Sequence, residues 1–195
     1  MKHLNVFPRV LACVLLASSG AASAQHAGHP VASPAPSPYA GQQAREIKAF
    51  SPAQTADLLA GKGMEQAKAA ELNGYPGPMH VLELAGPLAL SASQRQDSEA
   101  LLAGHKAEAR ALGARLVDAE RELDTAFAGK RIDPAQLDLL TRRIGLIQAE
   151  LRASHLRAHL RQAGLLTPAQ VALYAELRGY TGEPATTAPG RHSSH

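Results

Sequence analysis

The sequence has no tryptophan, one cysteine, three phenylalanines and four tyrosines. No segment alternates convincingly between apolar and polar residues, whereas alanine and leucine are abundant, so helices are favoured over strands. No apolar run reaches the roughly 20 residues that cross a bilayer. The chain also lacks a glycine-rich phosphate loop, a Gly-x-Ser-x-Gly elbow and a His-Glu-x-x-His motif, so we expect no catalytic residues and no enzymatic activity.

Residues 1–24 are organised like a secretory signal peptide. Lys2 and Arg9 precede a short apolar run at 10–16, and Ala22-Ser23-Ala24 forms a small-x-small cleavage site. We therefore predict cleavage after Ala24 and a periplasmic mature protein. The alternative, a lipoprotein modified at Cys13, is disfavoured because no hydrophobic segment precedes that cysteine. Cleavage removes Cys13, so the mature protein has no disulfide and must be stabilised by packing.

The remaining chain divides by composition into three stretches. Residues 25–38 are rich in Pro, Ala, Ser and His, and residues 181–195 in Thr, Pro, Gly and Ser. Neither stretch has enough apolar side chains to form a core, so both are predicted to be disordered. Residues 39–180 between them have the normal size of one domain.

The charges give little support for nucleic-acid binding. The chain has 20 Lys and Arg against 17 Asp and Glu, and loss of Lys2 and Arg9 with the signal peptide brings these numbers closer. Acidic residues such as Glu108, Asp118 and Glu122 lie among basic ones. We interpret them as a solvated helix surface rather than an acid/base pair, and we expect no nucleic-acid partner.

A five-residue pattern recurs four times, with an apolar residue, then a capping residue, then glutamine three positions after the cap. The copies are Phe50-Ser51-Pro52-Ala53-Gln54, Leu90-Ser91-Ala92-Ser93-Gln94, Ile132-Asp133-Pro134-Ala135-Gln136 and Leu166-Thr167-Pro168-Ala169-Gln170. The cap accepts from the third helical amide while glutamine reaches back to the cap amide, so each copy predicts a helix start. The predicted ends are Gly61 or Gly63, Gly129, Gly164 and Gly179. We predict a loop at 73–78 and a short helix at 80–84 between the first two starts.

Apolar stripes on the second and third long helices predict a helical hairpin. They consist of Leu112, Leu116, Ala119, Leu123 and Ala126, and of Leu137, Leu140, Ile144, Ile147 and Leu151. Both have the spacing of one helix face, and the connection at 129–133 is short enough to make the helices antiparallel neighbours. The expected fold is therefore all-α, a hairpin-based bundle of four to five helices.

The third helix carries a second apolar stripe on nearly the opposite side. Its members are Leu139, Leu146, Ala153 and Leu160. Either this stripe packs on the fourth helix, or it forms a surface for a second copy of the chain or for a client protein. The arginines that accompany it are Arg142, Arg143, Arg152, Arg157 and Arg161. Apolar surface edged with flexible cations suits many unfolded clients.

Two of the helix starts also carry a family resemblance. Leu90-Ser91-x-x-Gln94 stands before the hairpin and Leu166-Thr167-x-x-Gln170 after it. With the export signal, this arrangement resembles the Spy/CpxP proteins, whose signature is a pair of Leu-Thr-x-x-Gln motifs, and the related periplasmic heavy-metal sensors. The resemblance covers about residues 78–180, with Ser91 in place of threonine, which still caps. It assigns no role to residues 50–78.

The resemblance implies a curved antiparallel homodimer with one of two functions. The first is an ATP-independent, holdase-type chaperone whose partners are unfolded or misfolded envelope proteins. The second is a metal-responsive envelope protein that has a membrane-bound regulator as its partner. The chaperone is the leading hypothesis, and it needs no cofactor.

The histidines suggest an alternative to the chaperone hypothesis, namely that the protein is a heavy-metal sensor or resistance protein. His155 and His159 are four residues apart on one helix face, which suits a shared metal ion. By helical angle His155 should be largely buried and His159 should lie at the margin of the apolar stripe. The alternative interpretation is a core histidine bonded to a carbonyl, with a second exposed one.

Two histidines make an incomplete site for Zn, Cu, Ni or Co. The candidates for the other ligands are Met79, His80, Glu83 and His105. The related sensors place a histidine pair on their first helix, where this chain offers Met79, His80 and Glu83. Four further histidines, at 26, 29, 192 and 195, lie in the predicted tails and are interpreted as incidental polar residues.

Overall fold

The computed structural model describes residues 36–181. The chain divides into a unit of residues 1–38 and a unit of residues 39–195, and all the helices below belong to the second. The predicted signal peptide with Cys13, the linker up to residue 35 and the tail from residue 182 lie outside the described residues. The same is true of the four tail histidines.

Residues 36–181 form helices and no strand, which confirms the all-α prediction. The helices are η1 (Gln42–Ala44), α1 (Pro52–Leu59), α2 (Lys68–Glu71), α3 (Pro78–Glu83), α4 (Ala92–Ala128), α5 (Pro134–Leu165) and α6 (Pro168–Leu177). The single turn α2 is too short to show periodicity in the sequence. The predicted short helix at 80–84 begins earlier, at Pro78, because proline at the first helical position loses no hydrogen bond.

All four predicted caps begin helices. Ser51, Ser91 and Thr167 form complete capping boxes with the glutamine three residues later. Asp133 accepts from the amide of Gln136 and caps α5. Because each cap is a bond between residues three apart, the starts follow from local sequence alone.

The helix ends agree less well with the glycines. Gly61 and Gly179 have positive φ and follow the ends of α1 and α6. Gly129 caps α4 with a right-handed φ, and the left-handed residue is Lys130 with φ 50°. The prediction that Gly164 ends the third helix is wrong: α5 continues to Leu165, because Leu166 is the first residue to turn extended before the Thr167 cap.

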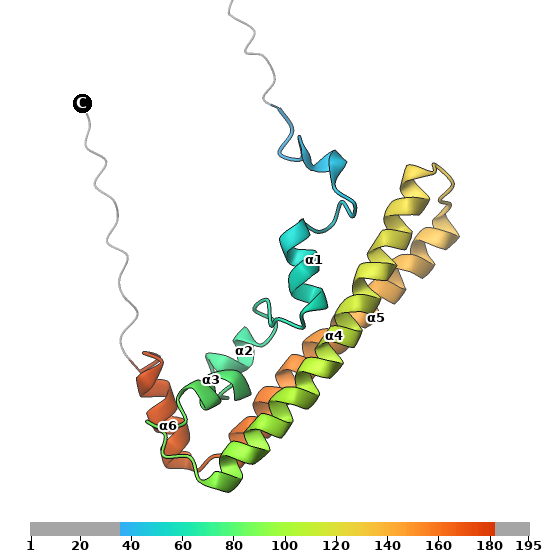
Figure 1. Ribbon diagram of the computed structural model, residues 1–195. Helices are drawn as coiled ribbons and strands as arrows, with labels where there is room; N and C mark the ends of the chain where they lie inside the picture. Colours follow the sequence, from blue (N-terminus) through green and yellow to red (C-terminus); the bar gives the residue numbers. More distant parts are fainter. Residues whose placement is uncertain (1–35, 182–195) are drawn as a thin grey trace, which may run out of the picture. The chain divides into compact units, whose positions relative to one another are not determined.

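Helices α4 and α5 form the predicted antiparallel hairpin (Figure 1). Both stripes lie at their interface, where Leu112, Leu116, Leu140, Ile144, Ile147 and Leu151 are all buried. This confirms the pairing inferred from the helical period.

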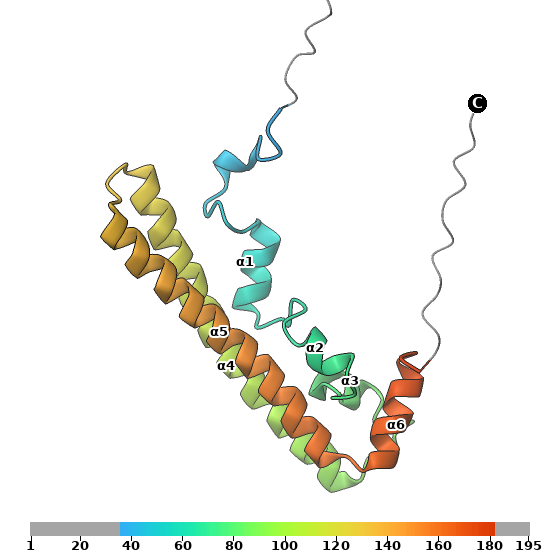
Figure 2. The same ribbon diagram turned by 180° about the vertical axis from the view of Figure 1, so that it is seen from behind.

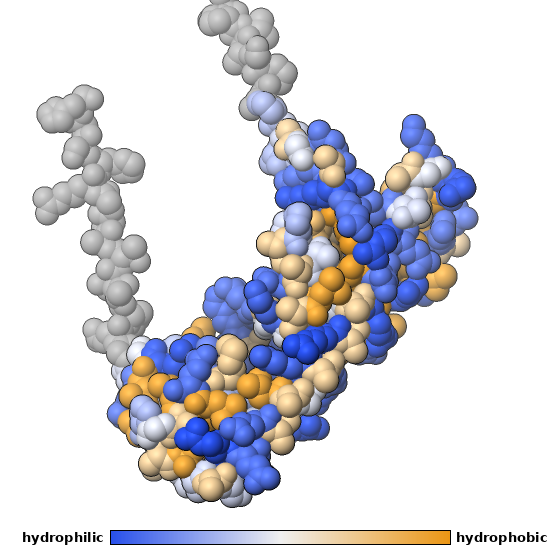
Figure 3. Space-filling model, in the orientation of Figure 1, coloured by the Kyte–Doolittle hydropathy of each residue, from blue (hydrophilic) through white to orange (hydrophobic). Residues whose placement is uncertain are grey.

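The segment before α4 runs along one face of the hairpin, as both views show (Figures 1 and 2). Ile47 and Leu58 complete the core between the two long helices. Lys48 forms an ion pair with Asp124 near the hairpin loop, and α1 packs on α4 midway along it. Helix α3 then contacts both α4 and α5 nearer the open end. Figure 3 shows apolar side chains gathered on this face beside α1 and around α3 and α6.

Helix α6 completes a second core at the open end of the hairpin. Val81, Leu88, Leu166 and Tyr174 are its buried members. Beside it, the glutamines of the two motifs bond each other: Gln94 Nε2 donates to Gln170 Oε1 at 2.8 Å, and Gln170 Nε2 donates to Gln94 Oε1 at 3.0 Å. Each amide also donates to a backbone carbonyl, of Leu165 and Leu88 respectively. The two motifs therefore join the starts of α4 and α6.

The second stripe of α5 lies open on the surface. Leu139, Leu146 and Leu160 are 68%, 66% and 55% exposed, and Ala153 is half-buried. The interpretation that this stripe packs on the fourth helix is wrong, because α6 turns away to pack on α3 and the segment at 84–90. The stripe has no partner within residues 36–181.

Candidate functional site

A cavity of about 970 Å³ lies where the segment at 60–80 covers α4 and α5. From α5 it is lined by His155, Ala158 and His159, and from α4 by Leu102, His105, Lys106 and Arg110. Met64, Met79 and His80 line the opposite wall. Both members of the predicted pair, His155 and His159, therefore face this one cavity.

A series of hydrogen bonds joins α4 to α5, and it begins at His105 and His155 in the lining of this cavity. His105 Nε2 and His155 Nδ1 are 3.0 Å apart, and the two rings meet edge to face. On its other side His105 Nδ1 lies 3.3 Å from Ser154 Oγ. The Ser154 hydroxyl donates to Glu108 Oε2 at 2.8 Å, and Arg157 donates to the other oxygen of Glu108.

This series of hydrogen bonds fixes the tautomers of the His105 and His155 rings. The bonds from Ser154 and Arg157 hold the pKa of Glu108 below its usual range, so its carboxylate accepts the one hydroxyl proton of Ser154. Ser154 Oγ must then accept from Nδ1–H of His105, which leaves a lone pair on His105 Nε2. That lone pair accepts from Nδ1–H of His155.

The consequence is a bare lone pair on Nε2 of His155. This atom is buried and has no hydrogen-bond partner within residues 36–181. His155 is 4% exposed, and burial, reinforced by the neighbouring His105 and His159, lowers its pKa to about 4. The ring is therefore neutral at physiological pH and presents Nε2 as a ligand or acceptor. Histidines that bind metals have this arrangement, with one nitrogen donating to the protein and the other free.

His159 is held in the same way one turn later. Its Nδ1 donates to the carbonyl of Tyr75 at 2.7 Å and lies 3.5 Å from Glu71 Oε2. A neutral ring in this position also leaves Nε2 without a proton. As predicted, His155 is buried and His159 lies at the margin of the core.

The other predicted ligands are more scattered around the cavity than His155 and His159. His80 Nδ1 bonds Glu83 Oε2 at 2.9 Å, and Glu83 is not among the residues that line the cavity. Met79 is on the cavity wall and partly exposed. Between residues 36 and 181, no group of three or more His, Cys, Asp or Glu side chains is arranged to hold a metal ion.

Ser154, His105 and Glu108 are the residue types of a hydrolase triad, but their hydrogen bonds run in the wrong direction. A nucleophilic serine must donate its proton to histidine. Here Ser154 donates to the carboxylate and accepts from the histidine, and its side chain is buried. The trio therefore orients His155 rather than activating Ser154.

No family model, curated protein or solved structure matches this chain. The resemblance to Spy/CpxP proteins accordingly stays a prediction that depends on the two glutamine motifs. None of the helices in the described part of the chain has the length and apolar character to span a bilayer.

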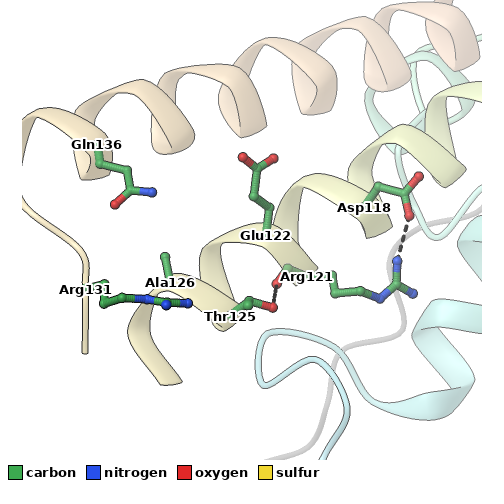
Figure 4. Close-up of a pocket in the computed structure, with 7 residues that line it drawn as sticks. All are labelled: Asp118, Arg121, Glu122, Thr125, Ala126, Arg131 and Gln136. Atoms are coloured by element: carbon green, nitrogen blue, oxygen red, sulfur yellow. Dashed lines mark hydrogen bonds and ion pairs between the residues drawn. The ribbon is translucent and has the colours of Figure 1, made fainter. Parts of the chain in front are cut away.

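A second cavity, of about 500 Å³, lies at the loop end of the hairpin (Figure 4). Three of its charged side chains are paired, Arg121 with Asp118 and Glu122 with Arg143. It contains no histidine or methionine, so we assign it no ligand.

Sequence reasoning identified His105, His155 and His159 but missed the groups that orient them. Ser154 is 49 residues from His105, and Tyr75 is 84 residues from His159. Glu108 acts through Ser154, which is 46 residues away, so none of these bonds belongs to a local motif. Met64 was also missed, because a single methionine in a loop carries no pattern. The spacing from Glu108 to His105 is compatible with one helix face, but it does not reveal the Ser154 bridge.

Proposed function

We propose that the protein is a holdase-type, ATP-independent chaperone for exported proteins. The observation that carries this proposal is the stripe of exposed leucines on α5, Leu139, Leu146 and Leu160. Three large apolar side chains on one helix, each more than half exposed, form a surface that water solvates poorly and an unfolded chain can cover.

The flanking arginines add a cationic border. Arg143 and Arg157 are paired with Glu122 and Glu108, whereas Arg142, Arg152 and Arg161 form no ion pair within residues 36–181. Flexible guanidinium groups beside leucines can contact aromatic, acidic and backbone groups of many clients without a fixed shape. The same stripe is the surface on which a homodimer would form, so client binding and self-association are expected to compete.

The test is suppression of aggregation by a stripe variant and by a matched control. Leu139→Ser with Leu146→Ser removes two exposed leucines of the stripe, and Leu59→Ser with Leu177→Ser removes two exposed leucines elsewhere. We expect the stripe variant to lose most of the suppression of denatured lysozyme aggregation while its helicity stays unchanged. The control should retain it. Equal suppression by both variants, or none by the native chain at equimolar amounts, would refute the proposal.

A second function, binding of a transition metal, is favoured by a separate observation. The unpartnered Nε2 of His155 has the tautomer of a metal ligand, and His159 presents a second such nitrogen one helical turn away. We expect His155→Ala and His159→Ala each to abolish tight binding of Zn, Cu, Ni or Co. Binding that is lost only when the tail histidines are replaced would exclude this function.

A further inference from the structure

The cavity of about 970 Å³ contains more soft donors than the histidine pair alone. It is lined by every histidine and every methionine of residues 36–181, and these are Met64, Met79, His80, His105, His155 and His159. Imidazole and thioether groups together suit soft transition-metal ions, whereas carboxylates suit hard ones.

Two glycines next to the methionines lie beside the histidine rings, Gly77 in close approach and Gly63 at ordinary contact distance. A Cβ atom added to Gly63 would lie 4.0 Å from His155 Nδ1, and Met64 is the next residue. A Cβ atom added to Gly77 would overlap the His159 ring, at 2.8 Å from Cε1, and Met79 follows two residues later. The segment that carries Met79 therefore packs tightly on the His159 ring, and the segment that carries Met64 passes the Nδ1 side of the His155 ring.

The backbone at Met64 is held in an uncommon conformation. Met64 and Glu65 have φ values of 41° and 62°, in the left-handed region that side chains with a Cβ atom rarely adopt. This turn packs Met64 against the core cluster that includes Ala109 and Leu151.

We propose that this cavity binds a soft monovalent cation, Cu(I) or Ag(I), through Nε2 of His155 and His159 and the thioether sulfurs of Met64 and Met79. The proposal rests on the metal-binding function above and names its ligand class.

The charged groups around the cavity favour a monovalent ion. Its lining includes Lys62, Lys68, Lys106, Arg110 and Arg178 but only two carboxylates, those of Glu65 and Glu71. Glu65 pairs with Lys68. Glu71 accepts from Tyr174 and Tyr180 through Oε1, and its Oε2 is buried without a hydrogen-bond partner, 3.5 Å from His159 Nδ1. Five basic side chains against two carboxylates leave a net positive charge around the cavity, and the repulsion by that charge doubles for a divalent ion.

The experiment uses the full chain with its other strong ligands removed. Cys13→Ser eliminates the one thiol, and asparagine at positions 3, 26, 29, 192 and 195 eliminates every histidine outside residues 36–181. This protein is titrated anaerobically with Cu(I) against a chromogenic Cu(I) chelator, and separately with Ag(I) and Zn(II) by calorimetry. Met64→Leu and Met79→Leu test the sulfur ligands, because leucine keeps the volume and removes the sulfur.

We expect one Cu(I) or Ag(I) per chain. Each leucine variant should weaken Cu(I) binding at least about tenfold and change Zn(II) binding by less than about threefold, because the thioether is a soft ligand. In protein labelled with ¹³C at the methionine methyl groups, Ag(I) should shift the Met64 and Met79 signals and leave Met1 in place.

Unchanged Cu(I) affinity in both leucine variants, with no methyl shift, would overturn this proposal. If Zn(II) then still bound and were lost in His155→Ala, metal binding itself would stand with nitrogen ligands only. If the native chain bound none of these ions, the metal-binding function would fall together with the soft site. Circular dichroism of each variant confirms that it is folded.

Discussion

The contact between α1 and α4 depends on Gly113, and its replacement by alanine tests the packing of the whole N-terminal segment. A Cβ atom at this position would lie 2.2 Å from the carbonyl oxygen of Leu58 and 2.8 Å from its carbonyl carbon. Both are backbone atoms, so no side chain can rotate away and α1 itself must move. Ordinary contact begins at 3.4 Å, so the shift required is about 1 Å.

The magnitude follows from comparison with a second glycine of the same helix. Gly104 lies in α4 with no atom within 4 Å of an added Cβ atom. Alanine there should raise the free energy of unfolding by about 1 kcal/mol, because alanine is the better helix former. The same gain applies to Gly113→Ala, but overpacking costs about 1–3 kcal/mol. Gly113→Ala should therefore be less stable than Gly104→Ala by about 1–3 kcal/mol.

Urea unfolding followed by circular dichroism measures both variants. Hydrogen exchange should also be faster in α1 of the Gly113→Ala protein than in α1 of the Gly104→Ala protein. If the two variants differ by less than about 0.5 kcal/mol and α1 exchanges equally in both, α1 does not pack on α4 through Gly113, and this account of the fold is wrong.

Three further predictions concern single side chains. Gln94→Ala should lower stability by about 2–3 kcal/mol, because it removes a cross-motif bond and a cap, whereas Gln54→Ala removes only a cap and should cost about 1 kcal/mol. Lys130→Gly should raise stability by about 1 kcal/mol, because it relieves a left-handed φ, and equal urea midpoints would contradict this. His155 has a folded pKa of about 4, below its unfolded value, so the unfolded chain binds more protons between about pH 6.5 and 4. Stability should therefore fall by about 3 kcal/mol as pH drops through that window, and His155→Gln should flatten the dependence measured by urea unfolding.

Much of the fold follows from the sequence because the decisive interactions are local. The caps at Ser51, Ser91, Asp133 and Thr167 bond residues three positions away, so they need no tertiary information. The hairpin follows from the period of its stripes and its short connection. The burial of His155 follows from the same helical angle.

Tertiary structure alone decided which surfaces meet and which stay open. The stripe of Leu139 and Leu146 has the period of a packed face in the sequence, and only the direction of α6 leaves it exposed. His105 and His155 are 50 residues apart, and their bond depends on the register of α4 against α5. The bare lone pair on His155 requires Ser154 and Glu108 in addition. Such contacts join residues distant in the chain, and a linear pattern does not encode their register because many registers bury the same stripes.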